Sequence, residues 1–251
     1  MTRSLVRRVA LAALLATVAF GATGCFAFRR VETFSSEPKT ETRTIPKDGT
    51  SGLDARFKMP AGVLNVDGDT DSLADLSFRS TNPDWLPTVS STQSESASGT
   101  VTSLAVAVPD GVNLLRGTRN YEWDVHLATD VPSRLRFELG AGENDLDLRG
   151  MDVRSLRVTT GVGTTTIDLS GPRSQSLSAE ITCGVGELTV RVPADVGVRI
   201  SGRQEGIGNL TADGFTLNGE ELTNDAWATA TTTIEITLQR GIGDVRIETV
   251  D

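Results

Sequence analysis

A short glycine motif recurs in the second half of the chain and constrains its fold more than any other feature. Two glycines separated by one residue occur five times. From first glycine to first glycine the steps are 21, 23, 22 and 35 residues. A nearly constant step of this size is typical of a solenoid, in which each repeat forms one coil. The pairs are Gly140 and Gly142, Gly161 and Gly163, Gly184 and Gly186, Gly206 and Gly208, and Gly241 and Gly243.

Each glycine pair is followed by six residues in which apolar and polar side chains alternate. The fourth of these residues is apolar in every repeat, and the third and fifth are polar. Alternation with a period of two is typical of a half-buried β-strand. We therefore expect five parallel strands stacked in chain order, with a buried ladder formed by Leu146, Ile167, Val190, Ala212 and Ile247. In this register, Asp168 and Arg191 should be exposed.

A second strand fits into each of the first three coils, where apolar residues alternate again. Its candidates are Leu156 with Val158, Leu177 with Ile181, and Val198 with Ile200. The paired glycines should lie at corners that need a positive φ or a close approach of two backbones. Because they precede strands and not helices, we exclude phosphate-binding loops. The predicted fold is all-β, a parallel β-solenoid of about 21–23 residues per coil over residues 139–251, preceded by an irregular β subdomain over residues 51–138.

The first 24 residues have the pattern of an export signal peptide. Three arginines precede an apolar run from Val9 to Phe20, and small residues then lead to Cys25. A basic start, an apolar middle and a small-residue end are typical of such signals. The end resembles the lipobox of bacterial lipoproteins, although Ala22 stands where leucine is commonest. The resemblance implies that the chain is cut before Cys25 and that this cysteine is acylated, which would anchor the protein to a membrane.

Two alternatives remain for this segment. An uncleaved run from Val9 to Phe28 is just long enough to span a bilayer, and ordinary secretory cleavage would release the chain. All three interpretations place the remaining residues outside the cytoplasm, and the first two tether them in the cell envelope. Residues 25–50 are rich in Ser, Thr, Glu, Lys and Arg. This composition predicts a flexible tether between the anchor and the folded part.

The chain is acidic, which restricts its partners. Its formal net charge is −9, and removal of residues 1–24 would leave −12, because that segment holds three arginines and no acid. An acidic body disfavours nucleic acid and anionic lipid headgroups as general partners. The expected partners are the membrane, through the N-terminal lipid, and an unidentified envelope protein or glycan. Cys183 is the only other cysteine, and we expect it to be a small buried residue.

Few residues are candidates for chemistry. His126 is the only histidine, which excludes a metal site with several histidines. Stacked acids in a parallel β-helix can bind calcium or act as acid and base on a polysaccharide. The outward fifth position of the five strands holds Asp147, Asp168, Arg191, Asp213 and Glu248. Because Arg191 interrupts this row, we expect a solvated charge ladder, with no catalytic residue, no metal ligand and no cofactor.

The final strand, residues 243–251, should expose an unpaired edge. A polar and turn-rich excursion, residues 214–238, comes just before it. We expect this excursion to fold over the edge as a cap, so that residues 232–238 pair with the final strand. A capped edge would keep the protein monomeric.

Several phrases in a fixed order resemble one family. They are Met59–Gly62, Pro83–Pro87, Glu122–Leu127, Asp130–Pro132 and Leu139–Glu143, which leads into the repeated glycine pairs. The set resembles the bacterial toast-rack family, whose solenoid is similar to the C-terminal domain of LiaF-type cell-envelope stress proteins. The resemblance covers residues 53–251. It implies an all-β extracytoplasmic domain, and it supplies no activity and no catalytic residues.

LiaF-type proteins also carry several membrane helices and damp a stress-sensing kinase. This sequence has one long apolar segment, at its start, so the resemblance does not extend to that role.

The sequence predicts a non-enzymatic, membrane-tethered β-solenoid lipoprotein that serves as an envelope scaffold, adhesion or sensing module. The alternative is a polysaccharide-active or calcium-binding β-helix enzyme.

Overall fold

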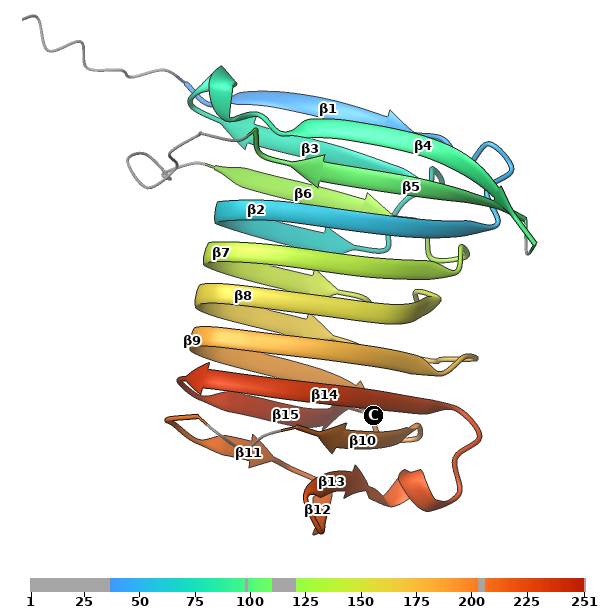
Figure 1. Ribbon diagram of the computed structural model, residues 1–251, viewed down its shortest axis with the longest axis vertical. Helices are drawn as coiled ribbons and strands as arrows, with labels where there is room; N and C mark the ends of the chain where they lie inside the picture. The colour runs from blue at the N-terminus through green and yellow to red at the C-terminus, as the bar shows by residue number, and fades with distance from the viewer. Residues whose placement is uncertain (1–36, 98, 110–120, 203–205, 251) are drawn as a thin grey trace, which may run out of the picture. The chain divides into compact units, whose positions relative to one another are not determined.

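The computed structural model describes residues 37–97, 99–109, 121–202 and 206–250, which lie in one compact unit (Figure 1). This part of the chain is built almost wholly of strands. They are β1 (Lys39–Ile45), β2 (Gly52–Asp67), β3 (Ala74–Ser80), β4 (Thr88–Ser96), β5 (Gly99–Ala107), β6 (Glu122–Leu127), β7 (Ser133–Asp147), β8 (Val153–Asp168), β9 (Leu177–Pro193), β10 (Gly197–Ser201), β11 (Leu210–Ala212), β12 (Phe215–Asn218), β13 (Glu221–Asn224), β14 (Thr233–Ile242) and β15 (Val245–Val250). Two short 3-10 helices are η1 (Pro83–Trp85) and η3 (Asp225–Ala228).

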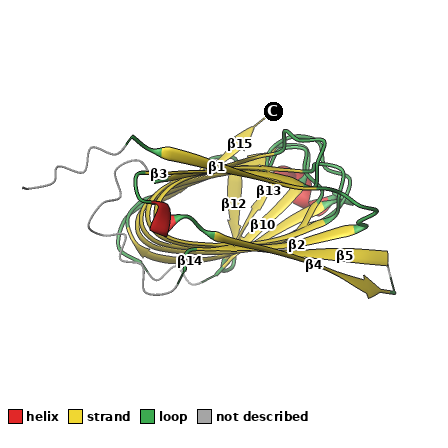
Figure 2. Cartoon of the chain, turned by 90° about the horizontal axis from the view of Figure 1, so that it is seen from above, coloured by secondary structure: helices red, strands yellow, loops and turns green. Residues whose placement is uncertain are grey.

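Four long strands, β2, β7, β8 and β9, form the centre of the stack. Each turns back at one side of the stack and ends in a loop at the other (Figure 1). Neighbouring strands are parallel and in register before and after the turn, so Leu146 lies beside Ile167 and Ile167 beside Val190. Viewed along the stack, the two halves of the coils form two layers (Figure 2). The chain is therefore an all-β, solenoid-like fold, as the spacing of the glycine pairs predicted.

The turn within each long strand depends on glycine. Gly163 has a φ of 135°, and a Cβ atom added there would lie 1.8 Å from the carbonyl oxygen of Gly142 in the preceding coil. The first glycine of the same pair, Gly161, would place a Cβ atom 2.6 Å from the carbonyl oxygen of Gly140. Both conditions expected at the corners, positive φ and close backbone approach, therefore occur there.

The core lies between the two layers and is filled by inward side chains. Leu146, Ile167, Val190 and Ile247 are each at most 1% exposed. Cys183 is buried too. The candidates for the second strand are also buried: Leu156, Val158, Leu177, Ile181, Val198 and Ile200. The expected burial of the apolar ladder is thus confirmed, with Ala212 only partly buried at its end.

The order of the coils differs from the prediction. The last coil, β14 and β15, is inserted between β9 and the coil formed by β10 and β11, so Ile247 lies between Val190 and Ala212. Stacking in chain order was wrong, because the strand that buries more apolar surface against β9 takes the place beside it. The inward side chains of β14 are Ile234, Ile236 and Leu238. This longer apolar strand covers more of β9 than the five-residue β10 could, and buried apolar area is the dominant stabilising term.

The cap prediction was also wrong. Residues 233–238 pair with β9 and β10, whereas the final strand, β15, pairs with β9 and β11. Over residues 245–247 the final strand therefore lies between two neighbours and is not an open edge. The excursion instead forms a hairpin of β12 and β13, which extends the sheet beyond β10.

At its N-terminal end, the stack of coils begins before the first glycine pair. Along its length β2 is in register with β7, and Ala61 and Gly62 take the positions of Ala141 and Gly142. Residues 39–45, part of the expected flexible tether, form β1 and pair with β3. The tether is therefore shorter than composition indicated. Cys25 and the rest of residues 1–36 lie outside the described residues.

An aromatic cluster joins the segments that carried the family resemblance. Tyr121 packs edge-on to Trp85 and Trp123, with ring centroids 6.5 and 6.1 Å apart, and Trp123 packs edge-on to Phe78 at 5.4 Å. The Tyr121 hydroxyl donates a hydrogen bond of 2.6 Å to the carbonyl oxygen of Trp85. The cluster fixes η1 against β6 and fills the core at this end.

We expect Gly163→Ala to destabilise the protein strongly. The added methyl group meets backbone that cannot move without separating two coils, so the loss in unfolding free energy should exceed about 3 kcal/mol. Gly150→Ala is the matched control, because Gly150 also has a positive φ of 66° but nothing lies within 4 Å of an added Cβ. It should cost about 1–2 kcal/mol. Urea unfolding measures both, and equal losses would contradict the close-approach explanation.

The single tyrosine of the chain gives a second test. Burial raises the pKa of Tyr121 from 10.0 to about 12. Between these values the folded protein holds a proton that the unfolded chain has lost, so stability should fall as the pH rises from 10 to 12. Tyrosinate absorbance reports this residue alone, and Tyr121→Phe should flatten the alkaline loss. Titration of the folded protein near pH 10 would contradict the burial.

Candidate functional site

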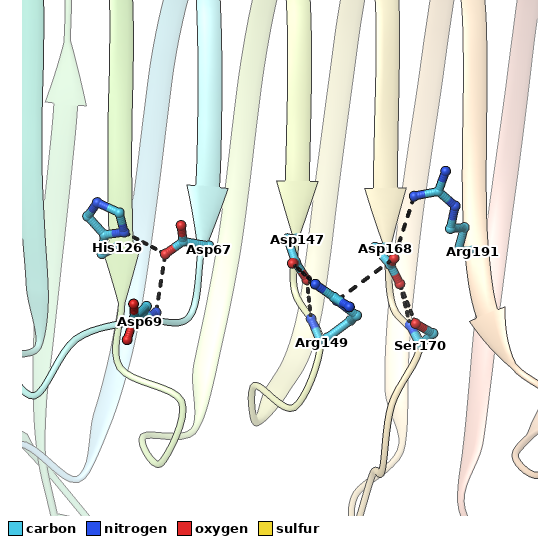
Figure 3. A network of polar contacts seen from close by, with 8 residues as sticks. All are labelled: Asp67, Asp69, His126, Asp147, Arg149, Asp168, Ser170 and Arg191. Atoms are coloured by element: carbon cyan, nitrogen blue, oxygen red, sulfur yellow. Dashed lines mark hydrogen bonds and ion pairs between the residues drawn. The ribbon is translucent and has the colours of Figure 1, made fainter. Parts of the chain in front are cut away.

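The outward fifth position forms a row of charged side chains where the coils end (Figure 3). Asp147, Asp168, Arg191 and Glu248 lie on adjacent strands in that order. Asp213 comes directly after β11 and is exposed. The predicted ladder is therefore present, with Glu248 following Arg191 because the last coil is inserted there.

Aspartates in this row also end the strands. Asp67, Asp147 and Asp168 each accept a hydrogen bond from the backbone N–H two residues further on, at 3.2, 3.2 and 2.9 Å. This contact is the Asx turn, in which an aspartate side chain stabilises a reversal of its own backbone. The repeat of the same turn in three coils gives these carboxylates a structural role.

The acids of the ladder are paired with arginines. Arg149 donates from Nε to Asp147 Oδ1 at 2.7 Å, and Arg191 lies between Asp168 and Glu248, at 3.7 and 3.5 Å. The Arg149 guanidinium holds the pKa of Asp147 below its usual value. Arg191 therefore does not merely interrupt the row, as the sequence indicated, but links its two neighbours.

The expected exposure of Asp168 was wrong. The residue is 8% exposed, whereas the Arg191 side chain is 43% exposed. Asp168 is covered because Ser170 turns over it and donates hydrogen bonds to Oδ1 from both its N–H and its hydroxyl, at 2.9 and 2.5 Å. A buried carboxylate is stable only when it is paired and hydrogen-bonded in this way.

His126 extends the row at its other end. Its Nδ1 lies 2.5 Å from Asp67 Oδ1, and Asp75 is its neighbour on β3. Trp123, Val125 and Leu127 are buried, so the histidine faces away from them, as the alternation predicted. The sequence did not reveal the contact with Asp67, because β2 and β6 are separated by more than fifty residues and become neighbours only in the stack.

These groups offer little to catalysis or to a metal. Within the described ranges, no three His, Cys, Asp or Glu side chains gather as a metal site. A general acid needs a raised carboxyl pKa, whereas the Asp147 pKa is lowered. The arrangement favours a structural charge ladder.

A second ladder was missed by the sequence. The residue between the two corner glycines points outward, and these residues stack in register. They are partly exposed Ala141 and four exposed side chains, Val162 (57%), Val185 (44%), Ile242 (51%) and Ile207 (70%). The repeated apolar residue inside each Gly-x-Gly motif was the signal that could have indicated this apolar ridge.

We expect Asp147→Asn to reduce the loss of unfolding free energy that the protein suffers in acid. The folded-state pKa of Asp147 is lowered, so its contribution to stability is complete above the unfolded pKa and is lost as the pH falls through the folded one. Asparagine keeps an oxygen for the Asx turn but removes the charge. Asp213→Asn is the control, because Asp213 is exposed. Unfolding free energies measured between neutral and acid pH should show a smaller loss for Asp147→Asn only.

Comparison with one solved structure agrees with this architecture. A solved structure described as a candidate cell adhesion protein from Clostridium sporogenes ATCC 15579 matches with a TM-score of 0.77 and 26% identity, over 85% of this chain and 100% of that one. One described as a candidate adhesin from Bacteroides fragilis NCTC 9343 matches with a TM-score of 0.35 and 12% identity, over 85% and 98%. No curated protein matches the sequence significantly.

Within the described part of the chain, no helix is long and apolar enough to cross a membrane.

The model of the N-terminal domain of toast_rack, DUF2154, matches residues 34–191, which is more than half of the chain. This match spans the coils from β2 to β9, with the first three glycine pairs and the ladder residues Asp147, Asp168 and Arg191. The chain therefore belongs to the toast-rack family.

Proposed function

We propose that this protein is a non-enzymatic extracytoplasmic adhesion or scaffold module, tethered to a membrane by a lipid on Cys25. The observation that carries the proposal is the in-register stack of coils, which repeats each outward position as a straight row. Stacked repeats present extended surfaces that suit large partners better than small substrates. The similarity to a candidate cell adhesion protein over its full length supports the same class.

The pairing of the charged side chains also supports a binding role. Asp147, Asp168 and Glu248 contact arginines of their own ladder. Carboxylates paired in this way act as parts of the framework. We therefore favour the scaffold over the alternative of a polysaccharide-active enzyme.

The proposed tether would keep the module close to the membrane. If Cys25 carries the lipid, residues 25–38 separate it from β1, which begins at Lys39. Fourteen extended residues span at most about 50 Å. A tether of this length leaves the stack free to meet a partner in the surrounding envelope.

Retention on envelope material tests the binding role. We expect the full chain, held on beads in mild detergent, to retain fragments of the bacterial envelope, and beads without protein to retain none. The same fragments should show no new reducing sugar ends after incubation. Release of such ends would support the enzyme instead, and absence of retention would contradict the adhesion proposal.

We expect Cys25→Ala to move the protein from the membrane fraction to the soluble fraction. A lipid on the cysteine thiol is the proposed anchor, and two or more acyl chains give stable attachment. Cys183→Ala is the matched control, because Cys183 is the other cysteine and is buried in the core. Cell fractionation and the mass of the N-terminal peptide measure the outcome. A Cys25→Ala protein that stays in the membrane would favour an uncleaved apolar anchor.

A further inference from the structure

One face of the stack carries a group of basic side chains although the chain is acidic. The group lies on the outward side of β2, β7 and β8, on the half of each coil before the glycine corner. Its members are exposed, and we call them the cationic face: Arg56, Lys58, Arg134, Arg136, Arg154 and Arg157. They come from segments far apart in the sequence, and the parallel register brings them together.

Half of these cations have no partner among the residues that the structure describes. Arg56 pairs with Glu138 at 2.7 Å, Arg157 with Glu180 at 2.5 Å, and Arg154 with Asp152 at 2.6 Å. The other three, Lys58, Arg134 and Arg136, make no ion pair or hydrogen bond with any described residue. Their positive charges therefore remain available to an external anion.

The register also places like charges side by side. Arg136 lies directly between Arg56 and Arg157 on adjacent strands, which are about 4.8 Å apart. Like charges directly opposite one another destabilise a sheet. In the charge ladder on the other half of the coil, Arg149 and Arg191 alternate with acids. Glu138 and Glu180 pair with the two outer arginines of the row, but no acid lies between the three in register. An anion bound at Arg136 would relieve the remaining repulsion.

Two hollows open beside these cations. One of about 590 Å³ is lined by Lys58, Arg136 and Arg157 together with one acid, Glu138. Another of about 630 Å³ is lined by Arg134 and Arg154 together with one acid, Asp54. Cations therefore outnumber acids in both. Arg136 lines the first hollow and Arg134 the second, and the two residues are two positions apart on β7, about 6.8 Å along the strand. We call the run of basic side chains between the two hollows the basic track.

The opposite layer of the coils has the reverse charge. Its outward positions near the same end of the stack hold Glu122, Asp124, Glu143 and Asp145. These acids repel an anion, whereas the cationic face attracts it. Such segregation orients a charged partner and raises the rate at which it finds the site.

We propose that the cationic face binds a linear anionic glycan polymer of the cell envelope, one that bears a carboxylate or phosphate on each repeat. The inference rests on the proposed adhesion role and names its partner. A polymer chain can lie in the track and place successive anions on Arg134, Arg136 and Lys58. A flat layer of lipid headgroups cannot follow two hollows, and the net negative charge opposes its approach.

Binding of polygalacturonate to the full chain in nonionic detergent tests the proposal. We expect binding that weakens with added salt, because exposed charges are screened, and no binding of neutral dextran. Arg134→Gln with Arg136→Gln should weaken binding about tenfold or more. The matched control, Arg79→Gln with Arg246→Gln, removes the same charge from exposed arginines on the other layer. It should change binding less than about twofold.

Several results would overturn the proposal. They are no binding of polygalacturonate or of a glycerol-phosphate teichoic acid, equal binding by both double variants, or equal affinity for phosphatidylglycerol vesicles. Self-association in light scattering that the Arg134 and Arg136 changes abolish would mean that the acidic layer of a second copy is the partner. The unfolding midpoint of each variant checks that the fold is intact. If envelope fragments are retained but neither polymer binds, the adhesion role stands and this inference fails.

Discussion

The structure depends on how closely two backbones can approach at the glycine corners. A Cβ atom at Gly163 or Gly186 would lie 1.8 Å from a carbonyl oxygen of the preceding coil. Only a residue without a side chain permits the strand to turn there while its ladder continues on both sides. The turn without a break lets one strand of 15 to 17 residues contribute to both layers. The core, the rows of outward side chains and the two faces all follow from this geometry.

Strict register has a cost as well as a benefit. It aligns identical positions, so apolar residues form continuous buried ladders, but it also aligns charges. On the layer after the corner, Arg149 and Arg191 are placed between acids and offset their repulsion. On the layer before the corner, Arg56, Arg136 and Arg157 are adjacent without an acid between them. Glu138 pairs with Arg56 and Glu180 pairs with Arg157, but Arg136 between them has no acid partner among the described residues. This uncompensated charge gives the protein a physical reason to bind anions on that layer.

The two ends of the stack are completed in different ways. At one end, β11 has only three residues and the β12–β13 hairpin extends the other layer. Short edge strands offer few unpaired groups to another chain. At the other end, the aromatic cluster around Tyr121 closes the core beneath η1 and β6. A few large aromatic side chains therefore complete the core at this end.

The sequence by itself determined the repeating elements of this protein. The spacing of Gly161 and Gly163 from their counterparts predicted the corners, and the alternation after them predicted which residues are buried, because both signals arise from local backbone geometry. The tertiary structure decided the rest. Insertion of β14 and β15 beside β9, the burial of Asp168 beneath Ser170, the contact of His126 with Asp67 and the gathering of six cations on one face each join segments distant in the chain. Such contacts depend on which surfaces match best when the coils stack, and no local pattern records that competition.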